Sequence, residues 1–150
     1  MEYSHIDSSG IIPLAKRSGE WKVFLIQYRG YEQFWGCPKG HLEPKETHQE
    51  AACRELKEET SLEVLRFLHE EPILEEFHWF KNGERRHKRV LIYLAEVTGD
   101  VFLQKEEIVG GEWFSLPEAI EKVAHQEGKA TLRKAQRLMV NDIGEAQARR

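Results

Sequence analysis

Cysteine is scarce in this chain of 150 residues, which contains only Cys37 and Cys53. The two are not arranged as a CxxC pair, and no further cysteine is available to complete a disulfide framework. This content indicates neither a disulfide-stabilised fold nor a structural zinc site. Both cysteines are expected to be small packing residues.

Long apolar runs are also missing from the sequence. No stretch approaches the roughly 18 apolar residues that a membrane-spanning helix needs. The first residues, MEYSHIDSSG, lack the basic and apolar regions of a signal peptide. No membrane association is expected, and a cytoplasmic location is the default expectation.

Positive charge is not in excess, because 22 lysines and arginines face 26 aspartates and glutamates, for a formal net charge of -4. Proteins that bind long polynucleotides usually present a basic surface, so a polynucleotide partner is not expected. The sequence also lacks internal repeats, low-complexity tracts and linkers. Residues 1–150 are therefore expected to form a single compact domain.

Runs of β-branched and aromatic residues, bounded by turn residues, are the strand signals in this chain. They predict strands at residues 10–16, 21–28, 62–68, 74–80 and 87–97, with a short apolar piece at 112–116. The dipeptide Asn82-Gly83 lies between two of these runs and is typical of a tight hairpin turn. We therefore expect residues 74–80 and 87–97 to form a hairpin.

Two capping boxes of the form T/S-x-x-E mark the starts of helices. They are formed by Thr47 with Glu50, and by Ser115 with Glu118 ahead of residues 117–125. A last helix is expected at residues 130–140, followed by a polar, frayed tail after Asn141. Strands and helices in this order predict an α/β fold with a mixed sheet.

Three glutamates in the first of these helices, Glu55, Glu58 and Glu59, have the spacing i, i+3 and i+4. On a helix they fall within one arc about 100° wide, where like charges repel by a few tenths of a kcal/mol per pair. A divalent cation would relieve this repulsion, and oxygen ligands are those that magnesium or manganese prefers. A solvated acidic face is the ordinary explanation for a glutamate-rich helix taken alone.

The surrounding residues change that balance, because they resemble the Nudix box. The matching positions are Gly40, Glu46, Arg54, Glu55, Leu56, Glu58, Glu59 and Leu62. Ser61 departs from the pattern, since the family usually has glycine there, and we expect the chain to leave the helix by a different turn. A pattern of this length is far more specific than a single glycine motif.

The resemblance implies a Nudix-type α/β/α sandwich, with a mixed β-sheet and a metal-binding loop-helix-loop. It implies hydrolysis of nucleoside diphosphates linked to another group, with Mg2+ or Mn2+ as cofactor. The metal ligands it implies are Glu55, Glu58, Glu59 and the carbonyl of Gly40. Arg54 would orient these carboxylates by pairing with Glu58 or Glu46. A carboxylate, Glu58 among the choices, would accept a proton from the attacking water.

A second segment, W-x-x-P-K-G-H-x-E, resembles the diadenosine tetraphosphate hydrolase (asymmetrical) branch of the family. It consists of Trp35, Pro38, Lys39, Gly40, His41 and Glu43. Messenger-RNA decapping enzymes share W-x-x-P-K-G, but His41 and the lack of an added RNA-binding region favour the dinucleotide branch. Lys45 departs from that branch, which commonly has glycine there. Residues 88–97 and 112–114 also resemble the branch.

The same resemblance implies a set of substrate-binding residues. Lys39 and Lys88 match lysines that contact phosphate, with His41 beside them. Tyr31, Trp79 and Phe80 are placed to stack on adenine, although aromatic residues near a hairpin more often belong to the core. The other basic residues of the hairpin are either counter-charges for phosphate or guards of an edge strand. They are Lys81, Arg85, Arg86 and Arg89.

Glu107 matches an acidic residue that completes the metal or base set of the family, and Glu106 is the competing choice. The pair Gly110-Gly111 that follows is expected to let this loop move.

The expected reaction is hydrolysis of a nucleotide phosphoanhydride bond, first of all that of diadenosine tetraphosphate to give ATP and AMP. The alternatives are an RNA 5′ pyrophosphohydrolase or decapping-type enzyme, and a non-catalytic nucleotide-sensing module. The glutamates of the box argue against the last, because degenerate Nudix domains usually lose them.

Overall fold

The structure of the chain, a computed structural model, describes residues 4–31 and 34–148. The strands in these ranges are β1 (Ser4–Arg17), β2 (Glu20–Tyr28), β3 (Trp35–Gly36), β4 (Lys39–His41), β5 (Glu63–Phe67), β6 (Ile73–Lys81), β7 (Glu84–Thr98) and β8 (Ile108–Ser115). The helices are α1 (His48–Thr60), α2 (Leu116–Lys122) and α3 (Gln126–Ala148). None of the helices in the described part is long and apolar enough to cross a membrane.

All eight of these strands belong to one mixed sheet, with the central order β3-β2-β1-β7-β5. Strands β1 and β7 run parallel, from Ser4 opposite Arg86 to Leu14 opposite Glu96. The other pairings are antiparallel, and they add β4 to β1, β6 to β7 and β8 to β2. The long pair β1 and β7 thus forms the spine that holds the remaining strands.

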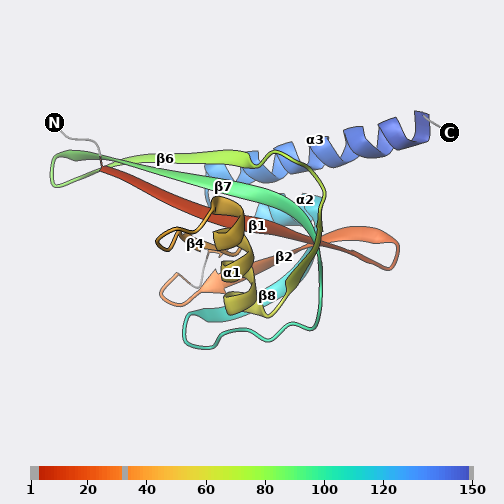
Figure 1. Cartoon of the computed structure of the whole chain (residues 1–150), viewed down its shortest axis with the longest axis horizontal. Coiled ribbons are helices and arrows are strands. Elements are labelled where there is room, and N and C mark those ends of the chain that lie inside the picture. Colours follow the sequence, from red (N-terminus) through yellow and green to blue (C-terminus); the bar gives the residue numbers. More distant parts are fainter. Residues whose placement is uncertain (1–3, 32–33, 149–150) are drawn as a thin grey trace.

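Helices cover both faces of the sheet, with α1 on one face and α2 and α3 on the other (Figure 1). Leu56 of α1 packs in a core with Ile11 and Phe24. Leu132 of α3 packs in a second core with Ile12. The alternation of side chains along β1 sends neighbouring isoleucines to opposite faces, so each face has its own apolar layer. The expected α/β/α sandwich with a mixed sheet is confirmed.

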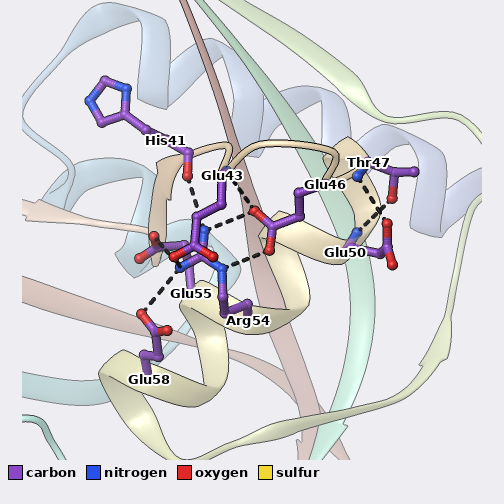
Figure 2. A network of polar contacts seen from close by, with 8 residues as sticks. All are labelled: His41, Glu43, Glu46, Thr47, Glu50, Arg54, Glu55 and Glu58. Atoms are coloured by element: carbon purple, nitrogen blue, oxygen red, sulfur yellow. Dashed lines mark hydrogen bonds and ion pairs between the residues drawn. The ribbon is translucent and has the colours of Figure 1, made fainter.

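Helix α1 begins as the sequence predicts. The Glu50 amide donates to the Thr47 hydroxyl at 3.1 Å, and the Thr47 amide donates to the Glu50 carboxylate at 2.9 Å (Figure 2). The helix ends at Ser61, which has φ 69° and ψ 1°. The expectation of a different exit turn was wrong, because Ser61 adopts the left-handed conformation that glycine usually supplies. Lys45, the other departure from the family pattern, also has a positive φ of 67°.

The predicted hairpin is also present. Strands β6 and β7 pair from Ile73 opposite Ile92 to Lys81 opposite Glu84. At its tip Asn82 and Gly83 have φ angles of 52° and 77°, the left-handed conformation that a type I′ turn requires at both central residues.

Several elements are longer than predicted. Strand β1 begins at Ser4, because the polar residues before Gly10 pair with β7 inside the sheet. Strand β8 begins at Ile108 and includes Gly110 and Gly111. Helix α3 continues to Ala148, so the predicted fraying after Asn141 was wrong. The last four residues of the helix, at 145–148, are glutamate, glutamine and two alanines, which are good helix formers.

Candidate active site

Helix α1 places its three box glutamates at different depths. The side chains of Glu55 and Glu58 are 15% and 54% exposed, whereas Glu59 as a residue is only 2% exposed. The apolar neighbours Ala52 and Leu56 are fully buried against the sheet and fix the rotation of the helix. The acidic arc therefore runs from the core to the surface, with Glu59 at its buried end.

Glu59 is a carboxylate held in the interior. Its Oε1 atom is buried and has no hydrogen-bond partner among the described residues. Burial raises the pKa of Glu59 to about 8, and the negative charges of Glu55 and Glu107 add to the rise. A contact with the Tyr28 hydroxyl offsets part of this effect. An unpaired buried carboxylate oxygen is costly unless a proton or a cation compensates it.

Tyr28 connects Glu59 to the strand that carries the glycine of the box. Its hydroxyl donates to the Lys39 carbonyl at 3.1 Å and accepts from the Lys39 amide at 3.2 Å. Burial raises the pKa of Tyr28, and the neighbouring Glu59 charge adds to this rise. Tyr28 was predicted only as the last residue of a strand, since nothing in the sequence links this position to Lys39.

Gly40 lies directly against the carboxylate of Glu55. A Cβ atom built on Gly40 would be 2.3 Å from Oε1 of Glu55, far inside van der Waals contact. Any other residue at this position would displace the carboxylate or the strand. This close approach is the physical reason for glycine at the first position of the box.

Arg54 is the centre of an ionic network between α1 and the preceding loop (Figure 2). Its guanidinium binds Glu46 through two bonds of 2.7 and 3.0 Å. It also donates to Glu55 at 3.0 Å, to Glu58 at 3.2 Å and to the His41 carbonyl at 3.0 Å. The sequence left Glu46 and Glu58 open as alternative partners, and Arg54 pairs with both.

The Arg54 network also determines charge states. Hydrogen bonds from Arg54 hold the pKa of Glu46 at about 2, and those of Glu46 raise the pKa of Arg54. A guanidinium that donates to several carboxylates fixes their orientation through its planar fork. Arg54 thereby holds Glu55 and Glu58 toward the same region.

The donors gathered here fit a hard divalent cation. They are carboxylate oxygens close enough to interact, because the charge of Glu55 raises the pKa of Glu59 and the charge of Glu58 raises the pKa of Glu55. Burial is the first cause of the raised pKa of Glu55, as it is for Glu59. The orphaned Oε1 of Glu59 is an acceptor that a magnesium or manganese ion would satisfy.

A cavity of about 710 Å³ lies beside this site, because Glu107 and Tyr28, the neighbour of Glu59, both line it. Its lining residues are Tyr28, Arg29, Tyr31, Phe34, Trp35, Gly36, Cys37, Lys39, Phe77, Trp79, Lys88, Glu106, Glu107 and His125. Aromatic rings make up much of the wall, and its charged residues are Arg29, Lys39, Lys88, Glu106 and Glu107. Its contributors come from β2, β4, the β6–β7 hairpin, the loop before β8 and the segment between α2 and α3. This volume lies within the usual range for sites that bind small molecules.

The two lysines of the cavity have different surroundings. The Lys39 ammonium lies 3.2 Å from Oε1 of Glu75 and 5.2 Å from the ring centre of Phe77. Burial lowers the pKa of Lys88, and the nearby charge of Lys39 lowers it further. Two cations held close together in a partly buried wall would be stabilised by an anionic ligand.

Glu75 was not predicted to take part in this site. It is buried, and its second oxygen accepts from the Thr131 hydroxyl of α3 at 2.5 Å. The run Leu74-Glu75-Glu76 gives no indication of which glutamate faces inward. A tertiary contact determines that Glu75 faces inward, because α3 covers the face of β6 that Glu75 occupies.

Only two of the three predicted aromatic residues line the cavity. Trp79 and Tyr31 line the cavity, whereas Phe80 does not, is 68% exposed and lies opposite Arg85. Alternation along β6 explains the division, since Phe80 follows Trp79 and points to the other side. The sequence missed further lining residues, namely Phe34, Trp35, Phe77 and His125.

His41 also lies outside the lining of this cavity. Its side chain is exposed, and its imidazole points away from the ionic network (Figure 2). Its carbonyl, however, accepts a hydrogen bond from Arg54. The contact described for His41 is therefore made by its backbone.

Glu106 and Glu107 both line the cavity. Of the two, Glu107 is the one whose negative charge raises the pKa of Glu55 and Glu59. The loop that carries them is tied to Arg29, whose amide donates to the Glu107 carbonyl at 2.7 Å. The Arg29 guanidinium donates to the carbonyl of Glu106 at 3.0 Å.

The expected hinge at Gly110-Gly111 was wrong. Both glycines belong to β8 and pair with Gln27 and Ile26 of β2. A Cβ atom on Gly111 would lie 2.6 Å from the ring of Phe24, so this glycine permits close packing between strand and core. The pair therefore serves the sheet and not a flexible loop.

Comparison with known proteins identifies the class to which this fold and site belong. The family model described as NUDIX domain matches residues 5–135, and the chain belongs to the Nudix hydrolase family. Hydrolysis of nucleotide pyrophosphate bonds is the chemistry that this membership supports.

The chain is similar to named members of the family over most of its length. The bis(5'-nucleosyl)-tetraphosphatase (asymmetrical) of Rattus norvegicus is 33% identical over 120 residues, which span 79% of this chain and 80% of that protein. The Caenorhabditis elegans protein of the same name is 29% identical over 131 residues, spanning 86% and 93%.

The structural comparison agrees. A crystal structure of a C. elegans Ap4A hydrolase binary complex has a TM-score of 0.71 and 26% identity, covering 91% of this chain and 98% of that one. The NUDIX domain of Shewanella oneidensis NrtR, complexed with ADP ribose, also has a TM-score of 0.71. At 14% identity it shows the shared fold alone.

Proposed function

We propose that this protein is an asymmetrical dinucleoside polyphosphate hydrolase, and that it cleaves diadenosine tetraphosphate to ATP and AMP. The observation that supports this best is the 710 Å³ cavity, whose wall combines aromatic rings and two lysines with Glu107 and with Tyr28, the neighbour of Glu59. One end can stack a base, the middle can neutralise phosphates and the other end can hold a metal. The named relatives support the same substrate class.

In this proposal the lysines bind the polyphosphate chain and the aromatic side chains bind adenine. Lys39 and Lys88 both line the cavity, and they are close enough for the charge of Lys39 to lower the pKa of Lys88. Tyr31 and Trp79 are exposed enough to accept a stacked base, since they are 62% and 37% exposed. Phe80 and His41 do not line this cavity, so we assign them no contact with the base in it.

Glu55, Glu58, Glu59 and Glu107 would hold magnesium or manganese, beside the backbone of Gly40. When bound, such a cation supplies charge neutralisation at phosphate oxygens and lowers the pKa of water. Arg54 holds Glu55 and Glu58 in place. Glu58 and Glu107 are exposed, so they are the carboxylates that can accept a proton from water.

The reaction inserts one water molecule into the polyphosphate chain. Its oxygen bonds to an outer phosphorus atom, the bond to the bridging oxygen breaks, and one proton passes to a carboxylate. The products are AMP, which carries the water oxygen, and ATP. Burial of the opposite end of the substrate against the aromatic wall would determine which phosphorus faces the carboxylates.

Product analysis with magnesium tests this proposal directly. The protein would be incubated separately with diadenosine tetraphosphate, ADP-ribose and capped RNA in ¹⁸O-labelled water. The products would then be separated and identified by mass spectrometry. We expect equal amounts of ATP and AMP, with the label in AMP. Two molecules of ADP would contradict asymmetrical cleavage, and a preference for capped RNA would favour the decapping-type alternative.

Two variants and one control connect turnover to the box. Glu58→Gln and Glu59→Gln should each lower turnover by about two orders of magnitude or more, because each removes a charge from the metal site. Glu63→Gln makes the same chemical change at an exposed residue that pairs with Lys57, and should retain normal turnover. Binding of substrate with no turnover at all in the unmodified protein would favour the sensing module instead.

A further inference from the structure

The hairpin β6–β7 carries a second cluster of metal-ligating side chains, outside the Nudix box. His78 of β6 and His87 of β7 are directly opposite in the ladder, and Glu76 precedes His78 by two residues. Residues spaced by two on a strand point to the same face, so all three side chains share one surface. One ligand atom from each residue lies within 4.8 Å of the others.

The geometry of this cluster is asymmetric. The His87 side chain is 8% exposed, and its Nε2 lies 2.6 Å from Oε2 of Glu76. Nε2 of His78 lies 3.9 Å from the same carboxylate oxygen. The two imidazole rings are stacked, with centroids 4.4 Å apart and planes at 7°. Three donor atoms thus converge, one from a buried ring and two from exposed side chains.

His87 and Glu76 lie within hydrogen-bonding distance of each other. The distance of 3.9 Å from His78 to the carboxylate exceeds hydrogen-bonding range. Two ligand atoms about 2.1 Å from a tetrahedral zinc ion are about 3.4 Å apart. Small rotations of the exposed His78 and Glu76 side chains would reach that spacing without any movement of the buried ring.

The charges around the cluster leave its carboxylate available. Arg89 is opposite Glu76 in the ladder, but its guanidinium binds the carboxylate of Asp7 at 3.2 Å. Arg85 lies over the ring of Phe80, with 6.0 Å between the guanidinium carbon and the ring centre. These interactions direct both guanidinium groups toward other partners.

We propose that Glu76, His78 and His87 bind a divalent transition metal ion of the zinc class. Imidazole nitrogen with one carboxylate oxygen suits zinc, cobalt or nickel, whereas magnesium prefers an all-oxygen shell. The site is therefore chemically distinct from the oxygen-only set of the Nudix box. Water molecules would fill the remaining positions on the exposed side.

The site lies back to back with the substrate cavity. Along β6 and β7, Trp79 and Lys88 line the cavity, while their neighbours His78 and His87 point to the other face. A metal ion would cross-link the two strands at the rung next to these lining residues. We expect it to restrain the hairpin beside the cavity, with no part in the chemistry of hydrolysis.

Zinc titration into metal-free protein tests the site. The background is the Glu58→Gln/Glu59→Gln double variant, in which the Nudix box has lost two of its four carboxylate ligands and competes less for the ion. By calorimetry we expect one zinc ion per chain, and by visible absorption a cobalt complex with nitrogen and oxygen ligands. No zinc binding in this background would overturn the proposal.

Further substitutions locate the bound ion. In the same background, His78→Asn and Glu76→Gln should each weaken zinc binding by about tenfold or more, because each removes one of three ligands. Both residues are exposed, so these variants test the site even where His87→Asn fails to fold. His69→Asn is the matched control, since His69 is outside the cluster and contacts the Glu71 carbonyl.

Stability provides a second measurement. Zinc should raise the melting temperature of the double variant and of its His69→Asn form, but not that of its His78→Asn form, because only ligands of the folded state stabilise it. Equal zinc affinity in the His78→Asn and His69→Asn forms would overturn the assignment.

Discussion

Lys45 and Ser61 show how single residues can depart from a family pattern without changing the backbone. They have φ angles of 67° and 69°, in the left-handed region. This conformation costs an ordinary residue about 1–2 kcal/mol, and glycine avoids the cost. These are also the two positions at which glycine is usual in similar proteins. The chain has therefore kept the turn and accepted strain in place of glycine.

Glycine at either position should stabilise the protein. We expect Ser61→Gly and Lys45→Gly each to raise the free energy of unfolding by up to about 1 kcal/mol, because relieved strain exceeds the added entropy of the unfolded chain. The gain at Ser61 should be the smaller one, since its hydroxyl donates to the Phe102 carbonyl at 3.2 Å. Urea unfolding would measure both changes. Ser61→Ala is the control, and a glycine variant less stable than it would contradict the strain argument.

Glu59 should make stability depend on pH when metal is absent. Its pKa of about 8 in the folded chain exceeds the ordinary value of 4.5, so the folded state binds an extra proton between these values. The free energy of unfolding should therefore be highest below pH 4.5, as far as this residue contributes, and fall as pH rises through about 8. In chelator, the melting temperature should drop by about 5 °C or more between pH 5 and pH 8.5.

Two comparisons isolate this effect. Glu59→Gln cannot lose a proton, so its melting temperature should fall much less over the same range. Magnesium should restore the unmodified protein at pH 8.5, because a bound cation replaces the proton. Parallel pH profiles for the two proteins would show that Glu59 is ionised without cost.

The sequence could predict the box residues because their geometry is local. Glu55, Glu58 and Glu59 face one way as a consequence of helical spacing alone. Tyr28 and Glu75 could not be predicted, because their roles depend on contacts with β4 and α3, which are distant in sequence.

At the scale of secondary structure, local signals also succeeded where they were strong. Asn82-Gly83 and the capping box at Thr47 located a hairpin and a helix start, since both are set by the backbone preferences of a few residues. Gly110-Gly111 misled, because a glycine pair is equally suited to a hinge and to a tightly packed strand. The cluster of Glu76, His78 and His87 became visible only from the strand register.

The loop before β8 carries two candidate catalytic glutamates, Glu106 and Glu107. Glu107 is the one whose negative charge raises the pKa of Glu55 and Glu59. We therefore expect Glu107→Gln to lower turnover by about tenfold to a thousandfold, as a partial contribution from a base or ligand. Glu106→Gln, the matched control on the same cavity wall, should remain near normal. Both would be measured at saturating magnesium over a range of substrate concentrations.

The opposite pattern would transfer the role to Glu106. Two nearly normal enzymes would mean that the box glutamates suffice. The ties from Arg29 to the carbonyls of both glutamates are backbone contacts, so neither substitution should release the loop.

For the molecule as a whole, the proposed function requires an acidic protein to bind a negatively charged substrate. The formal charge is -4, and the box adds a local concentration of carboxylates. Favourable attraction must come from the cavity itself, where Lys39 and Lys88 lie close enough for one to lower the pKa of the other. Their contribution should grow with the number of phosphates in the ligand.

The effect of replacing either lysine should therefore depend on the number of phosphates in the substrate. Lys88→Met should lower kcat/KM for diadenosine tetraphosphate by about tenfold to a hundredfold, but for ADP-ribose only a few fold, because fewer phosphates remain to be neutralised. Lys39→Met should show the same preference, with an added loss of stability, since it leaves Glu75 buried without its cation.

Lys81→Met makes the same change in net charge on an exposed part of the hairpin outside the cavity. It should affect both substrates equally and weakly. Equal losses on both substrates for Lys88→Met would contradict a role for this lysine in binding the polyphosphate chain.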